Sequence, residues 1–237
     1  YQSLDDLIDS TVPEKIKYYS QERAVDDIFD VMNELSIQKA HIVGLSMGGF
    51  AAIHFAIKYP DRANSIVVAA SGYGAEKEHE KYFQNLSNKV ADQFIKLGSK
   101  KFSEIYAKAA SRIPFMLKDQ LGWEYFLKRL SEHSEIGASM TMRGVQAERP
   151  SLYDMEQNLK SISTPTLIIV GDEDDHCLKP GLFLKKCIKA SGLLILPKTG
   201  HTINLEEPSH FNNFLSDFFT QVEHDKWFPR DPRSNPD

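Results

Sequence analysis

Cysteine is scarce in this 237-residue chain, which contains only Cys177 and Cys187. Two cysteines are too few for a disulfide framework, and neither lies in a Cys-x-x-Cys pair or in the Cys/His spacing of a zinc site. We interpret both as free thiols, and we expect a reducing, cytoplasmic location. The chain begins at Tyr1 rather than at methionine, so we also expect that its true N-terminus lies upstream.

Long apolar runs and an excess of positive charge are also missing. No stretch approaches the ~18 apolar residues of a transmembrane helix, so no membrane span is expected. The formal net charge is −5, with lysine and arginine scattered along the chain, which argues against nucleic acid as a partner. Hydrophobic residues make up 41% and charged residues 26%, a balance typical of soluble globular proteins. We expect one domain with an insertion.

Short apolar runs alternate with amphipathic patterns along most of the chain. These runs are rich in β-branched residues, and continuous apolar runs suit strands that are covered on both faces of a parallel sheet. The pattern therefore predicts an α/β fold, with a mostly parallel sheet and flanking helices. The predicted strands are 40–45, 65–70, 165–170 and 193–196, and the predicted helices are 20–36 with Ser20 as N-cap, 47–57, 155–162, 181–189 and 208–222.

One long segment breaks this alternation. Residues 75–148 carry helical patterns with Lys- and Glu-rich faces and no convincing strand, which predicts an inserted, all-helical segment. The core would then have a first part at 1–74, which opens with a connection over 1–19, and a second part at 149–224. Residues 225–237 are expected to form a polar tail.

The run Gly44-Leu45-Ser46-Met47-Gly48-Gly49 fits Gly-x-Ser-x-Gly and lies between a predicted strand and a predicted helix. In that context, the pattern is typical of a strained turn that projects a serine hydroxyl above a sheet. We expect Gly44 and Gly48 to make room for Ser46. The N–H of Met47 would open the helix and could stabilise an oxyanion. The alternative is a glycine-rich turn that allows close helix packing, with Ser46 as an N-cap.

A serine nucleophile requires a base and an acid that orients it, both later in the chain. The acidic loop 171–175 follows a predicted strand, and active sites of open α/β sheets collect at that end of the strands. We choose Asp174 as the acid, with Asp172 and Asp175 as the next candidates. The alternative is a solvated acidic loop without a catalytic role.

His201 follows the last predicted strand, and we choose it as the base. A hydrogen-bonded loop histidine is the alternative. His176 is a rival because it lies beside the acidic loop. A metal site built from Asp172, Asp174 and His176 is a further alternative.

Around the serine turn, the acidic loop and His201, the chain resembles the α/β hydrolases with a helical cap. The resemblance spans residues 20–222. It implies that Ser46, Asp174 and His201 form a catalytic triad, that 75–148 is a cap over the site, and that no metal or organic cofactor takes part. It is carried by Gly44-Leu45-Ser46-Met47-Gly48-Gly49, Tyr59-Pro60-Asp61-Arg62, Gly171-Asp172-Glu173-Asp174 and Gly200-His201 with Glu207-Pro208 behind it.

The family usually has several strands before the helix at 20–36, and a loop after one of them, often His-Gly, supplies a second oxyanion donor. Neither is found upstream in this sequence. We therefore expect an N-terminally truncated fold, in which Met47 alone remains as oxyanion donor.

The expected function is hydrolysis of a small, ester-like carbonyl substrate of apolar character through an acyl-enzyme, which leaves esters, lactones and diketones open. Phe115, Met116, Trp123 and Met140 are candidates to line the substrate pocket, together with Leu117, Tyr125, Phe126 and Met142. The same positions also fit the core of the helical segment. The alternative function is a hydrolase-like binding or receptor protein with little or no turnover. The sequence does not indicate the oligomeric state.

Overall fold

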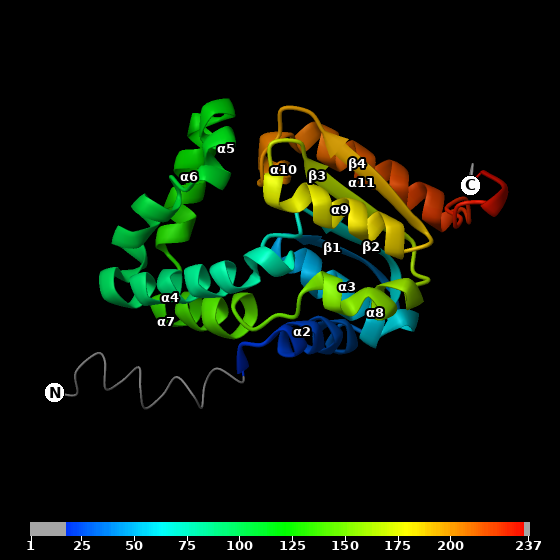
Figure 1. Cartoon of the computed structure of the whole chain (residues 1–237), viewed down its shortest axis with the longest axis horizontal. Helices are drawn as coiled ribbons and strands as arrows, with labels where there is room; N and C mark the ends of the chain where they lie inside the picture. Colours follow the sequence, from blue (N-terminus) through cyan, green and yellow to red (C-terminus); the bar gives the residue numbers. More distant parts are fainter. Residues whose placement is uncertain (1–17, 235–237) are drawn as a thin grey trace.

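The structure is a computed structural model of the chain and describes residues 18–234 (Figure 1). The connection predicted for 1–19 lies outside this range except for its last two residues, and so do the last three residues of the predicted tail.

Four parallel strands form the sheet. They are β1 (Ala40–Leu45), β2 (Ala63–Ala69), β3 (Thr166–Gly171) and β4 (Ser191–Leu196), and they lie side by side in chain order. Every neighbouring pair is parallel. The predicted parallel sheet is therefore confirmed, with strand starts that differ by a few residues. In this arrangement the carboxyl ends of all four strands meet at one edge of the sheet.

Helices cover both faces of the sheet. On one face lie α2 (Gln21–Glu34), α3 (Met47–Lys58), α8 (Glu156–Ser161) and α9 (Asp175–Cys187), and on the other lies α11 (Pro208–Glu223). Side chains alternate between the two cores: Ile66, Val68, Ile168 and Val170 face the first group, and Val67, Ala69, Leu167 and Ile169 face α11. Burial on both faces explains why these strands are continuously apolar in sequence.

Two helix starts illustrate where local signals succeed and fail. Ser20 caps α2 as predicted, because its Oγ accepts a hydrogen bond from the Arg23 N–H at 3.0 Å. The start predicted for α9 at residue 181 is wrong, since the helix begins at Asp175 and runs through Pro180. Proline removes one helical hydrogen bond. Burial of Cys177 and Pro180 in the helix offsets that loss.

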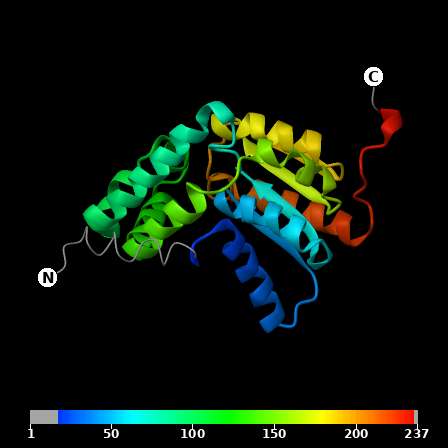
Figure 2. The same ribbon diagram turned by 60° about the horizontal axis from the view of Figure 1, so that its bottom comes forward.

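The inserted segment is helical, as predicted. It contains α4 (Lys77–Tyr106), α5 (Ile113–Lys118), α6 (Gln120–Ser131) and α7 (Glu135–Thr141), with short turns η3 (Ala110–Arg112) and η4 (Met142–Gln146). These helices lie to one side of the sheet, at the left of Figures 1 and 2. They have a small core of their own around Ala107, Phe115, Trp123 and Leu130. Among residues 18–234, none of the helices combines the length and apolarity that a membrane crossing requires.

Arg149 links this segment to the sheet domain. Its guanidinium donates to the Tyr73 carbonyl at 2.5 Å and lies over the rings of Phe50, in α3, at 3.9 Å and Phe83, in α4, at 4.7 Å. Burial lowers the pKa of Arg149 to about 9, so the group keeps its charge at neutral pH and retains these cation–π contacts.

The two inner strands, β2 and β3, are expected to dominate stability. Ile168 in β3 is 1% exposed and Ile195 in β4 is 43% exposed. Ile168→Ala is expected to lower the free energy of unfolding by about 2–5 kcal/mol, because it leaves a cavity in the core. Ile195→Ala serves as the matched control, with an expected loss of about 1 kcal/mol or less. Urea unfolding followed by circular dichroism measures both, and equal losses would contradict the assignment of the core.

Candidate active site

The site begins at the turn between β1 and α3. Ser46 has φ 53° and ψ −113°, in a region of positive φ that residues with a side chain rarely adopt. Two hydrogen bonds from β2 and the residues after it hold this conformation. The Ser46 N–H donates to the Ala69 carbonyl at 2.7 Å, and the Ser71 hydroxyl donates to the Ser46 carbonyl at 2.9 Å. The surrounding structure therefore offsets the strain and keeps the serine in place.

The turn requires glycine at two positions, one of which was not predicted. A Cβ on Gly44 would lie 2.0 Å from the Gly48 carbonyl oxygen, and a Cβ on Gly49 would lie 2.0 Å from the Ser71 Oγ. A Cβ on Gly48 would meet nothing within 4 Å. The expectation that Gly48 makes room for Ser46 is therefore wrong, because the close approach is between β1 and the backbone of α3.

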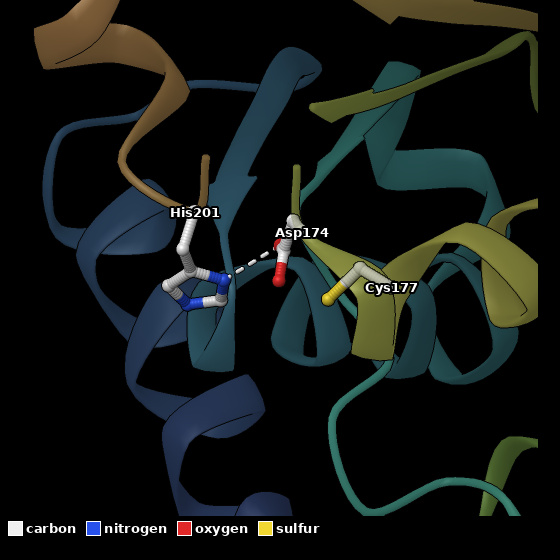
Figure 3. Close-up of side chains that lie close together, drawn as sticks. All are labelled: Asp174, Cys177 and His201. Atoms are coloured by element: carbon white, nitrogen blue, oxygen red, sulfur yellow. Dashed lines mark hydrogen bonds and ion pairs between the residues drawn. The ribbon is translucent and has the colours of Figure 1, made fainter. Parts of the chain in front are cut away.

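The structure brings Ser46, His201 and Asp174 into hydrogen-bond contact. The Nε2 of His201 lies 2.9 Å from the Ser46 Oγ. Its Nδ1 lies 2.8 Å from the Asp174 Oδ2, and Figure 3 shows this second contact. Both His201 and Asp174 are buried. A carboxylate only accepts, so Nδ1 carries the proton and Nε2 is left free to accept one from the serine hydroxyl.

Asp174 is the acid of its loop that meets His201. It occupies the N-cap position of α9, but its carboxylate accepts from the imidazole instead of capping the helix. Asp172 is exposed, and its Oδ1 accepts from the Thr199 N–H at 3.1 Å. Asp175 and Glu173 are also exposed. Residues 197–202, between β4 and the helix that begins at Ile203, form the histidine loop. The acidic loop therefore supports the histidine loop through Asp172 and contacts the imidazole through Asp174.

The metal site considered from the sequence does not form in the described part of the chain. His176 is exposed and stacks on Tyr73 with ring centroids 4.0 Å apart, while Asp172 and Asp174 bind the histidine loop. Their potential ligand atoms do not gather at one point.

A different set of possible ligand atoms does gather, from Asp174, Cys177 and His201, all within 4.8 Å of one another (Figure 3). Metal binding would require the Cys177 thiolate and a free Nδ1 on His201. Burial raises the pKa of the Cys177 thiol well above its usual value, and the nearby Asp174 charge raises it further. The Nδ1 of His201 already donates to Asp174. The arrangement therefore favours a hydrogen-bonded pair beside a neutral thiol.

Met47 connects the serine turn to a cleft. It is the first residue of α3, so its N–H has no acceptor within the helix, whereas the Ser46 N–H is occupied by Ala69. Met47 also lines a cleft of about 460 Å³ between the turn and the inserted helices. The other lining residues include Phe94, Tyr106, Leu130, Ala138, Thr141 and Met142.

The residues predicted to line the substrate pocket lie mostly elsewhere. Phe115 and Trp123 are buried in the core of the helical segment with Met116 packed against them, and the Trp123 Nε1 donates to the Ala107 carbonyl at 2.9 Å. Met140 is buried as well. Of the wider set, Met142 lines the cleft. Phe94 and Tyr106 were missed, because the helical spacing of α4 does not show which side faces the cleft.

Comparisons with known proteins agree with this architecture. The sequence matches the family model described as alpha/beta hydrolase fold over residues 9–208. The chain is 27% identical over 212 residues to a putative 2-succinyl-6-hydroxy-2,4-cyclohexadiene-1-carboxylate synthase of Bacillus subtilis, a match that covers 87% of this chain and 75% of that protein. It is 31% identical over 205 residues to a 2-hydroxy-6-oxo-6-phenylhexa-2,4-dienoate hydrolase of Comamonas testosteroni, covering 81% and 66% respectively.

A solved structure of MenH from S. aureus has the same fold. It superposes with a TM-score of 0.78 at 17% sequence identity, over 86% of this chain and 76% of that chain.

The two glycines of the turn are expected to respond differently to a methyl group. Gly44→Ala should lower the free energy of unfolding by about 1–3 kcal/mol or more, because its Cβ collides with backbone atoms that cannot move independently. Gly48→Ala should change it by about 1 kcal/mol or less, because the new methyl enters open space within a helix. Urea titrations of both variants make the comparison, and a Gly48→Ala loss as large as that of Gly44→Ala would refute this geometry.

Proposed function

The chain belongs to the α/β-hydrolase fold family, and we propose that it is a serine hydrolase that cleaves an ester-like or related carbonyl substrate through an acyl-enzyme. The observation that supports this most directly is the pair of hydrogen bonds on opposite sides of the His201 ring, 2.9 Å to the Ser46 Oγ and 2.8 Å to the Asp174 Oδ2. A serine hydroxyl becomes nucleophilic only when a base accepts its proton, and this geometry suits that transfer.

In the proposed reaction, Nε2 of His201 takes the Ser46 proton while Oγ attacks the carbonyl carbon. Asp174 holds the imidazole in the required tautomer and stabilises its positive charge. The imidazolium then protonates the leaving group, and the acyl group remains on Ser46. Water, activated by the same imidazole, hydrolyses the acyl-enzyme. None of these steps requires a metal or an organic cofactor.

Met47 is the proposed oxyanion donor. Its N–H lies at the start of α3, where the unpaired amides and the helix dipole favour negative charge. A tetrahedral intermediate on Ser46 develops its negative oxygen next to that amide, and such donors typically contribute about 10²- to 10³-fold to turnover.

The cleft beside Met47 is the proposed substrate site, with the helical segment as its cap. Its volume of about 460 Å³ is in the range of sites for small molecules. Phe94, Tyr106 and Met142 give it apolar walls, which favours an apolar acyl group. Esters, lactones and diketones all fit the proposal, because each presents a carbonyl carbon to Ser46. The two relatives named above support a small organic substrate.

Ser46→Ala tests the nucleophile. Hydrolysis of p-nitrophenyl acetate by this variant should fall by about 10⁴-fold or more, because neither Asp174 nor His201 can replace the lost Oγ. Ser163→Ala, which changes an exposed serine in the loop before β3, should hydrolyse the ester like the unaltered chain. Circular dichroism should show both variants folded, and undiminished turnover by Ser46→Ala would refute the assignment.

Ala138→Trp tests the cleft. The indole should occupy space that an acyl chain needs, and the KM for p-nitrophenyl butyrate should rise by about 10-fold, equivalent to about 1.4 kcal/mol of lost binding. Ala110→Trp places the same side chain at an exposed alanine in η3 and should leave KM unchanged. Steady-state kinetics measures both, and an unchanged KM in Ala138→Trp would exclude this cleft as the acyl site.

A further inference from the structure

Glu206 is a buried acid directly behind the histidine loop. It is the last residue of the short helix α10 (Ile203–Glu206), and its side chain is 0% exposed. One carboxylate oxygen, Oε2, accepts from the Gly200 N–H at 2.7 Å. The other, Oε1, accepts from the Thr202 N–H and from the Thr202 hydroxyl, each at 3.0 Å. These donors come from the residues immediately before and after His201.

A buried carboxylate persists only where hydrogen bonds and charge offset its desolvation. Three donors from the histidine loop do so here, and the Lys118 Nζ, from α5 of the helical segment, lies 3.8 Å from Oε2. The steps proposed for Ser46, Asp174 and His201 do not use this carboxylate. Its hydrogen bonds therefore point to a role in the conformation of the loop.

The demand on that loop is strict, because the His201 imidazole must reach Ser46 and Asp174 at the same time. A small rotation of the loop would lengthen at least one of the two contacts. Because one carboxylate binds the backbone on both sides of His201, the residue between them cannot rotate freely. The loop is also tightly packed, since a Cβ on Gly200 would lie 2.8 Å from the Pro114 ring and 3.1 Å from the Glu206 Oε1.

We propose that Glu206 is a positioning residue, which fixes the histidine loop so that the His201 imidazole contacts Ser46 and Asp174 together. The inference rests on the proposed function, because it assigns a role within the same site. It does not make Glu206 a catalytic residue, since its carboxylate binds the backbone and hydroxyl of the loop rather than the imidazole or the reacting atoms.

The chemistry of the side chain makes a sharp test possible. Glu206→Gln keeps the size of the side chain, but an amide has one acceptor oxygen and one donor nitrogen. On one side of the loop, a backbone N–H would then face the N–H of the new side-chain amide. A buried donor would be left unpaired. The variant should loosen the loop on one side without leaving a cavity.

The matched control is Glu207→Gln. Glu207 is the adjacent acid and also pairs with Lys118, at 2.5 Å, but its other contact is His210 at 3.3 Å rather than the histidine loop. For p-nitrophenyl acetate, Glu206→Gln should lower kcat by about 10- to 10²-fold with KM nearly unchanged, because binding is kept while alignment is lost. Glu207→Gln should keep both constants. Equal losses in the two variants would assign the effect to Lys118 and overturn the proposal, and so would an unchanged kcat in Glu206→Gln.

A second readout does not depend on turnover. The proton on Nδ1 of His201, hydrogen-bonded to Asp174, should give a low-field resonance in the proton NMR spectrum of the unaltered chain. In Glu206→Gln this resonance should shift or broaden, and in Glu207→Gln it should stay. An unchanged resonance in Glu206→Gln would contradict the positioning role.

Two controls separate the possible failures. If a fluorophosphonate probe does not label Ser46 in the unaltered chain, the proposed function fails, while the NMR comparison still tests the positioning. If Glu206→Gln does not fold, Thr202→Val tests the positioning role instead. This variant keeps the Glu206 carboxylate and removes only the hydroxyl donor. A lower kcat at constant KM in that variant supports the proposal, and an unchanged kcat overturns it.

Discussion

The hydrogen bond between the Ser46 Oγ and the His201 Nε2 joins residues 155 positions apart in the chain, and the candidate site depends on it. Ser46 follows β1 and His201 follows β4, the first and last strands of the described sheet. They meet because parallel strands send their carboxyl ends to one edge. Twist and side-chain packing across the intervening strands β2 and β3 therefore decide whether the two atoms come within reach.

Around this contact, local structural preferences give way to the requirements of the site. Ser46 takes a positive φ, held by bonds to Ala69 and Ser71. Asp174 stands at a helix start but turns its carboxylate to His201 instead of capping α9. Glu206 is buried although acids favour water. Such departures, each supported by specific contacts, are typical of functional sites.

Much of this arrangement was predictable from sequence, since buried parallel strands carry a strong apolar signal and Gly-x-Ser-x-Gly marks a strand-to-helix turn. The same reasoning led to Asp174 and His201, which the structure brings to Ser46. It failed where tertiary contacts determine the local structure. The need for Gly49 depends on the Ser71 side chain, the start of α9 on the burial of Cys177, and the wall of the cleft on the rotation of α4. Glu206 gave no signal of its own, because acids near a helix end are usually solvated.

In the proposed reaction, Ser46 becomes covalently acylated during turnover. Rapid-quench mass spectrometry measures this directly, by mixing the chain with p-nitrophenyl acetate, stopping the reaction in acid and mapping the added acetyl mass by peptide digestion. We expect the acetyl group on the peptide that contains Ser46, and we expect it to form at least as fast as steady-state turnover. Turnover without acetyl on that peptide, or with acetyl on another residue, would contradict the proposed reaction.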